Sequence, residues 1–174
     1  MTFIEHTVSW LKGENFEGGM LILWGVMLVV MAAYFWKFGH SATARTLIIP
    51  FLVVGLFWGI AAGMGLYQNM HRLDNFRMEY AKNPTAFVES EHMRVERFIG
   101  WYRYLLIGWS VLILIGLPIF MLWGGNNGRA IGVAFILFAV AGLLVDHTSE
   151  YNARIYKSEI DKALKSITSG KLQH

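Results

Sequence analysis

Four long stretches that contain no Asp, Glu, Lys, Arg or His constrain the fold of this chain more than any other feature. They run over residues 18–36, 47–67, 104–123 and 130–145. A helix of about 20 apolar residues, rising 1.5 Å per residue, crosses the hydrocarbon core of a bilayer. The sequence therefore predicts an all-α fold, a four-transmembrane-helix bundle that forms one membrane domain.

The composition supports the same class and excludes several others. Hydrophobic residues make up 55 % of the 174 residues and charged residues only 16 %, whereas about a quarter of a soluble domain is charged. The 15 Lys and Arg are interleaved with 12 Asp and Glu, so no basic stripe for nucleic acid is present. The chain has no cysteine, which excludes disulfides, thiolate metal ligands and cysteine nucleophiles.

The distribution of basic residues predicts the topology. Twelve of the 15 Lys and Arg lie before residue 18, between residues 68 and 103, or after residue 147. The two loops on the other side carry only Lys37, Arg45 and Arg129. Because Lys and Arg accumulate on the cytoplasmic side, we predict a multi-pass plasma-membrane protein with both termini in the cytoplasm.

Three segments outside the spans also have helical patterns. Residues 2–12 are amphipathic and precede Gly13, which predicts a short helix lying on the lipid headgroups. Residues 68–103 read as an extended cytoplasmic hairpin that turns at Asn83-Pro84, with Asn83 capping the second arm and Pro84 in its first turn. Residues 148–167 predict a cytoplasmic C-terminal helix.

The two arms of the hairpin carry apolar stripes with a charged residue inside each. Glu91 falls at the centre of one apolar face and Arg77 lies on the apolar face of the other arm. Both lie at a similar distance from the turn, so we predict a structural ion pair between Arg77 and Glu91 that fixes the register of the hairpin.

Glycine recurs every fourth residue in the second span, at Gly55, Gly59 and Gly63. One side of this helix is nearly bare backbone, which lets another helix approach closely in lipid. The sequence therefore predicts a helix-packing face here. The alternative is a groove for an apolar ligand, such as a lipid or quinone tail.

Residues with metal-ligating side chains lie in the predicted hairpin and at the start of the predicted C-terminal helix. Pairs of His and Asp or Glu at a spacing of three residues place both side chains on one helix face, and together they predict a site suited to Zn, Fe or Mn. The alternative for such pairs is a solvated or ion-paired surface. The candidate ligands are His71, Asp74, His92, Asp146, His147 and Glu150. No two histidines lie inside the spans at matched depth, which argues against bis-histidine haem.

One stretch resembles a known group of proteins. The run Tyr80-Ala-Lys-Asn-Pro-Thr-Ala-Phe-Val-Glu-Ser-Glu-His-Met-Arg-Val-Glu leads into Trp101-Tyr102-Arg103-Tyr104. It is similar to uncharacterised small bacterial inner-membrane proteins with four spans, which carry an Asn-Pro turn before the third helix. The resemblance implies a bacterial inner-membrane location and this topology, and it assigns no catalytic residue.

The absence of ionisable residues within the spans disfavours a self-contained transporter. We predict a non-catalytic inner-membrane protein whose helices bind membrane lipids, an apolar ligand, a membrane-protein partner or a second copy of the chain. The alternative is a metal-dependent membrane enzyme acting on a lipid-like substrate, using Glu91 together with the candidate metal ligands. An oligomeric channel is the third hypothesis.

Overall fold

The computed structural model describes residues 3–170 as four long helices. They are α1 (Phe3–Phe38), α2 (Ala42–Lys82), α3 (Pro84–Leu122) and α4 (Gly125–Thr168). All four are long and apolar enough to cross a membrane. The prediction of an all-helical chain with four membrane-length helices is confirmed.

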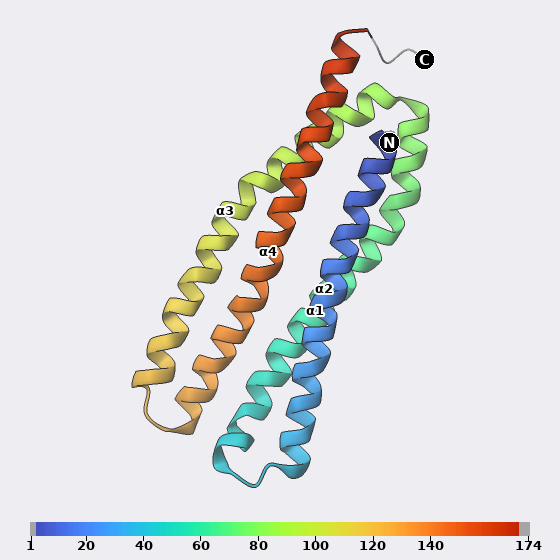
Figure 1. Cartoon of the computed structure of the whole chain (residues 1–174). Coiled ribbons are helices and arrows are strands. Elements are labelled where there is room, and N and C mark those ends of the chain that lie inside the picture. The colour runs from blue at the N-terminus through green and yellow to red at the C-terminus, as the bar shows by residue number, and fades with distance from the viewer. Residues whose placement is uncertain (1–2, 171–174) are drawn as a thin grey trace.

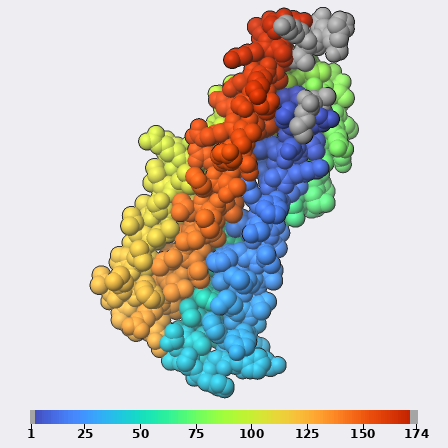
Figure 2. Space-filling model, in the orientation of Figure 1, coloured from blue at the N-terminus to red at the C-terminus, as the bar shows by residue number. Residues whose placement is uncertain are grey.

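The four helices form two hairpins. α1 packs mainly against α2, and α3 packs mainly against α4, while α4 joins the hairpins by also contacting α1 and α2. α1 begins and α4 ends at the same end of the molecule as the turn between α2 and α3 (Figure 1). Figure 2 shows α4, in orange and red, running beside the blue α1.

Each helix has an apolar part and a charged part, and the charged parts lie together. We call residues 3–17, 68–103 and 146–168 the polar half, and residues 18–38, 42–67, 104–122 and 125–145 the apolar half. Each half has its own core of buried side chains. One is built around Leu28, Trp58 and Ala141, and the other around Trp10, Val95 and Tyr156.

The turn between α2 and α3 has the predicted caps. The backbone N–H of Ala86 donates to Oδ1 of Asn83 at 3.1 Å, and Pro84 occupies the first turn of α3. Proline suits this position because the first N–H groups of a helix have no partner within the helix. Asn83 also ends α2, since its backbone N–H donates to the carbonyl oxygen of Glu79 at 3.1 Å.

The N-terminal segment differs from the prediction of a separate helix on the headgroups. α1 continues through Gly13 without a break, and Thr7, Trp10 and Leu11 are buried inside the protein. These side chains pack in the core of the polar half. Their apolar contacts are therefore with other helices and not, as predicted, with lipid. The prediction of a separate interfacial helix is therefore wrong.

Glycines allow close approach within each hairpin. Between α1 and α2, a Cβ on Gly25 would lie 2.6 Å from the carbonyl oxygen of Gly55. A Cβ on Gly55 would likewise lie 2.7 Å from the carbonyl oxygen of Gly25. In α4, a Cβ on Gly132 would lie 2.6 Å from the backbone nitrogen of Phe120. The predicted glycine face thus packs at Gly55.

The rest of the predicted glycine face does not pack in this way. Within residues 3–170, no atom would lie within 4 Å of a Cβ on Gly59 or Gly63. A Cβ on Gly25 would, however, lie 2.8 Å from the backbone nitrogen of Gly59. Gly59 is therefore approached along its backbone, while the Gly63 side faces open space.

Candidate functional site

Polar side chains from all four helices meet where the apolar half joins the polar half. We call this set the junction layer. Its carboxylates come from α1 and α4, and its hydrogen-bond donors come from α2, α3 and α4. The members are Glu14, Glu17, Asn69, Trp109, Asp146, Ser149 and Asn152.

Each carboxylate of the junction layer accepts a hydrogen bond from another helix. Glu17, only 7 % exposed, accepts from the hydroxyl of Ser149 and from Nδ2 of Asn152, the latter at 2.7 Å. Glu14 accepts from Nδ2 of Asn69 at 3.2 Å. These bonds hold α1 against α4 and α2 at one level, because a buried carboxylate without partners is costly.

A third bond of the same layer joins α3 to α4. The indole Nε1 of Trp109 donates to Oδ2 of Asp146 at 2.6 Å. The ring of Trp109 also lies against Gly142, where a Cβ would come within 2.5 Å of the indole. The glycine thus makes room for the indole that reaches Asp146.

Burial changes the pKa of two carboxylates of the junction layer, Glu14 and Glu17. Burial raises the pKa of Glu14 to about 7, against the opposing effects of Arg94 and of the hydrogen bond from Asn69. Burial also raises the pKa of Glu17, although Ser149 and Asn152 stabilise its charged form. Glu14 therefore takes up and releases a proton near neutral pH.

Glu91 lies at the centre of a second buried cluster, in the polar half. Its carboxylate is 2 % exposed and accepts from Nε and Nη2 of Arg94, at 2.8 and 2.6 Å. The hydroxyl of Tyr156 donates to Oε2 of Glu91 at 2.9 Å and lies 2.8 Å from the hydroxyl of Thr7. The cluster thus joins α1, α3 and α4.

The cation paired with Glu91 differs from the predicted one. The prediction placed Arg77 opposite Glu91, whereas the structure pairs Glu91 with Arg94 of the same helix. Arg77 instead lines a surface pocket with Glu5 and Lys12 of α1. The physical reason is that α1 packs along α2 in the polar half, so this side of α2 faces α1 rather than α3.

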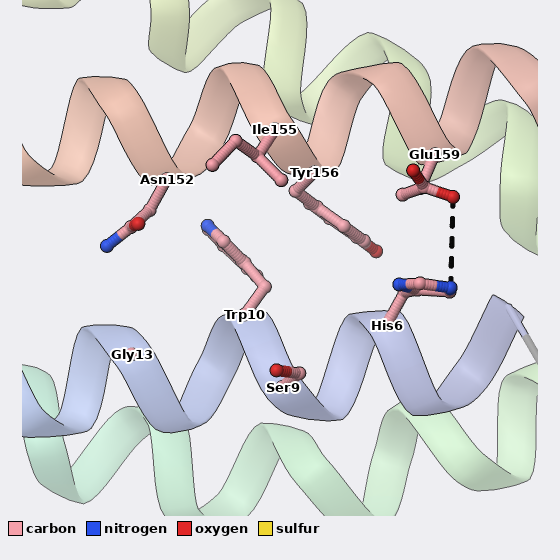
Figure 3. Close-up of a pocket in the computed structure, with 8 residues that line it drawn as sticks. All are labelled: His6, Ser9, Trp10, Gly13, Asn152, Ile155, Tyr156 and Glu159. Carbon is pink, nitrogen blue, oxygen red and sulfur yellow. Dashed lines mark ion pairs between the residues drawn. The ribbon is translucent and has the colours of Figure 1, made fainter. Parts of the chain in front are cut away.

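A small pocket opens between α1 and α4 beside this cluster. Its volume is about 160 Å³. Figure 3 shows Trp10 pointing from α1 toward α4, next to Tyr156, and the two rings are stacked with centroids 5.0 Å apart. His6 and Glu159 face each other across one end, 3.7 Å apart. The stacked rings fill much of the space, so this pocket contributes to packing rather than to ligand binding.

A larger, wholly apolar groove lies between α2 and α4 in the apolar half. We call it the slot. Its volume is about 400 Å³, within the range of about 300–1,000 Å³ that is usual for small-molecule sites. All its lining side chains are apolar: Ile49, Pro50, Val53, Val54, Phe57, Ile131, Ala134, Phe135 and Phe138.

Contacts between α2 and α4 close the slot at both ends. Toward the polar half, the rings of Phe57 and Phe138 meet edge to face with centroids 4.9 Å apart. Toward the loops, the hydroxyl of Thr43 donates to Oδ1 of Asn126 at 3.2 Å. α2 and α4 therefore touch at each end of the slot and are separated between these two contacts.

The candidate metal ligands are dispersed over the molecule. Nε2 of His92, on α3, lies 3.3 Å from Oδ1 of Asp161 and 3.8 Å from Oε1 of Glu96. The ring of His71 lies beside that of Tyr67, also on α2, with centroids 4.5 Å apart and the ring planes tilted by 45°. Among residues 3–170, no three His, Asp or Glu side chains are grouped so that they would hold a metal ion.

The remaining candidates are engaged elsewhere or face outward. Glu150 accepts two hydrogen bonds from Arg154, and Asp146 is bonded to Trp109. Asp74 and His147 are exposed. The structure thus places Glu14 and Glu17, which the sequence did not single out, in the junction layer with Asp146. The other predicted ligands lie apart, and the slot is a separate feature of the apolar half.

Comparisons with protein-family models, with curated proteins and with solved structures gave no match.

Proposed function

We propose that this chain is a non-catalytic bacterial inner-membrane protein that binds the hydrocarbon chain of a membrane lipid in the slot. The polar half lies in the cytoplasm in this proposal. The support for that orientation is the excess of Lys and Arg in the polar half over the three basic residues of the two opposite loops, following the positive-inside rule.

The observation that carries the proposal is an apolar groove bounded at its two ends by the Phe57–Phe138 and Thr43–Asn126 contacts. A concave apolar surface inside a bilayer fills with hydrocarbon, because a void forfeits van der Waals contacts. From Ile49 to Phe57 the slot extends over about 12 Å of helix. Half of the roughly 30 Å hydrocarbon core belongs to one leaflet, so the slot is nearly as long as one leaflet is thick.

The alternative of a metal-dependent enzyme has less support. Its ligands would have to come together from His71, His92 and His147, which lie on three different helices. The most strongly buried carboxylates, Glu17 and Glu91, are both held by hydrogen bonds from neighbouring helices. Such bonds suit residues that fix the helix arrangement.

The test uses a side chain that fills the slot. Ala134→Phe places a ring inside the slot, and Ala61→Phe makes the same change at an exposed position of α2. Both variants are purified in mild detergent and the retained phospholipid is counted by native mass spectrometry. We expect Ala134→Phe to retain one phospholipid fewer than the wild type and Ala61→Phe retain. Equal retention by the two variants would contradict the proposal.

A further inference from the structure

A second cavity, distinct from the slot, lies on α2 and α3 where the polar half approaches the apolar half. Its volume is about 460 Å³. Three arginines line it, Arg72 from α2 and Arg94 and Arg97 from α3. We call it the arginine pocket. Three guanidinium groups around one opening are costly to hold together unless an anion compensates them.

The charge of the arginine pocket is only partly compensated within the protein. Arg94 is paired with Glu91, yet its Nη1 atom is buried and has no hydrogen-bond partner among residues 3–170. Arg72 and Arg97 form no ion pair with any carboxylate in the described part of the chain. The guanidinium groups of Arg72 and Arg97 thus remain available to an anion.

The wall of the arginine pocket is apolar and exposed. Met93 is 64 % exposed, Phe98 44 % and Trp101 61 %. Large apolar side chains beside arginines suit a ligand that carries both a negative charge and hydrocarbon. Tryptophan in particular is enriched at the membrane–water interface.

The position along the helices places the pocket at headgroup level. Arg72 follows the predicted span 47–67 by five residues, and Arg97 precedes the span 104–123 by seven. At 1.5 Å per residue these offsets are about 7 and 10 Å. The headgroup region of a bilayer is about 5–8 Å thick on each side, and an arginine side chain reaches several ångströms back toward it.

We propose that the arginine pocket binds the phosphate group of an anionic phospholipid from the adjacent leaflet. The guanidinium groups of Arg72 and Arg97 donate to the phosphate oxygens, as arginine does through paired N–H groups. Phe98 and Trp101 lie against the glycerol and upper acyl carbons. The membrane is the source of the anion in this proposal, because the pocket borders the apolar half and has an exposed apolar wall.

The experiment measures lipid binding to the full chain in mild detergent by native mass spectrometry. The probes are phosphatidylglycerol, phosphatidylcholine with the same chains, and inorganic phosphate. The test variant is Arg72→Gln/Arg97→Gln. The control is Arg77→Gln/Arg103→Gln, which removes the same charge from the same two helices outside the pocket. Because phosphatidylcholine has the same chains, the difference between the lipids isolates the headgroup from binding in the slot.

We expect the wild type and the control to prefer phosphatidylglycerol, and the test variant to bind it roughly 25-fold more weakly, about fivefold per arginine. Equal affinity for the two lipids in the wild type would overturn the proposal, as would an equal loss in the control. If inorganic phosphate binds the wild type as tightly as phosphatidylglycerol, the site is one for soluble anions and the proposal fails.

Folding of the variants is checked by circular dichroism. If Arg72→Gln/Arg97→Gln does not fold, Arg97→Gln alone replaces it, since this side chain is exposed and forms no ion pair with another residue of the range 3–170. The single variant is expected to bind phosphatidylglycerol about fivefold more weakly. Unchanged affinity in that variant would overturn the proposal.

Discussion

The hydroxyl of Tyr156 donates a hydrogen bond of 2.9 Å to Oε2 of Glu91 and so joins α4 to α3 inside the polar half. The same carboxylate holds Arg94, whose guanidinium lies 4.6 Å from the centre of the Trp10 ring. One buried charge thus gathers contacts from three helices. Removing it leaves Arg94 partly buried without its anion.

Glu91→Ala is expected to destabilise the protein by about 3 kcal/mol, because losing one partner of a buried pair leaves the other charge uncompensated. Arg77→Ala is expected to change stability by less than about 0.5 kcal/mol, as is usual for surface positions. Thermal unfolding in detergent, followed by circular dichroism, measures both.

A double-mutant cycle identifies the cation that Glu91 holds. Glu91→Ala combined with Arg94→Ala should show a coupling of 1 kcal/mol or more, and Glu91→Ala combined with Arg77→Ala should be additive within about 0.5 kcal/mol. The reverse pattern would mean that Arg77 is the partner of Glu91 after all.

Glu14 gives the protein a pH-dependent stability of predictable sign. Burial raises its pKa from 4.5 to about 7, so the folded state binds the proton more tightly than the unfolded state. The stabilisation from this proton is complete below about pH 4.5 and is lost as the pH rises to about 7. Glu14→Gln should therefore be more stable than the wild type at pH 8, by on the order of 1–3 kcal/mol.

The measurement for Glu14 compares melting temperatures of wild type and variant from pH 5 to pH 8. Glu17 also has a raised pKa, but it is present in both proteins. Its effect on the melting temperature therefore cancels in the difference, which reports on Glu14. Glu89→Gln, a substitution of an exposed glutamate on α3, serves as the control. A constant difference between wild type and Glu14→Gln across the range would show that Glu14 does not titrate there.

The glycine face separates into a packed and an open part. Gly55→Ala is expected to destabilise by about 1–3 kcal/mol, because its Cβ would lie 2.7 Å from the backbone oxygen of Gly25 and overpacking forces backbone shifts. Gly63→Ala should be neutral or stabilising by up to about 1 kcal/mol, since alanine favours the helix. Similar losses in the two variants would show that a second chain packs at Gly63.

The sequence predicted the spans because apolar composition and length report on burial in lipid directly. It also placed Glu91 inside an apolar face and Asn83-Pro84 at a turn, and both are confirmed. These features depend on local periodicity and on local hydrogen bonds. The partner of Glu91 depends on which helices are neighbours, and periodicity within one hairpin does not contain that information.

The junction layer could have been found by extending the buried face of a span. On α1, the buried residues Leu21, Gly25 and Leu28 recur at intervals of three or four. The same spacing continued backward reaches Glu17 and Glu14. The predicted span 18–36 begins one residue after Glu17, so both glutamates lie outside it. The slot had no such signal, since it depends on where α2 and α4 separate.

Photo-cross-linking from inside the slot tests the central claim most directly. A diazirine amino acid of the size of leucine replaces Ile131 in the slot or, as the control, the exposed Leu114 of α3, and the protein is purified in mild detergent and irradiated. We predict a covalent phospholipid adduct at position 131, and only detergent adducts at position 114, where bulk lipid has been exchanged. A phospholipid adduct at both positions, or at neither, would contradict binding of a lipid chain between α2 and α4.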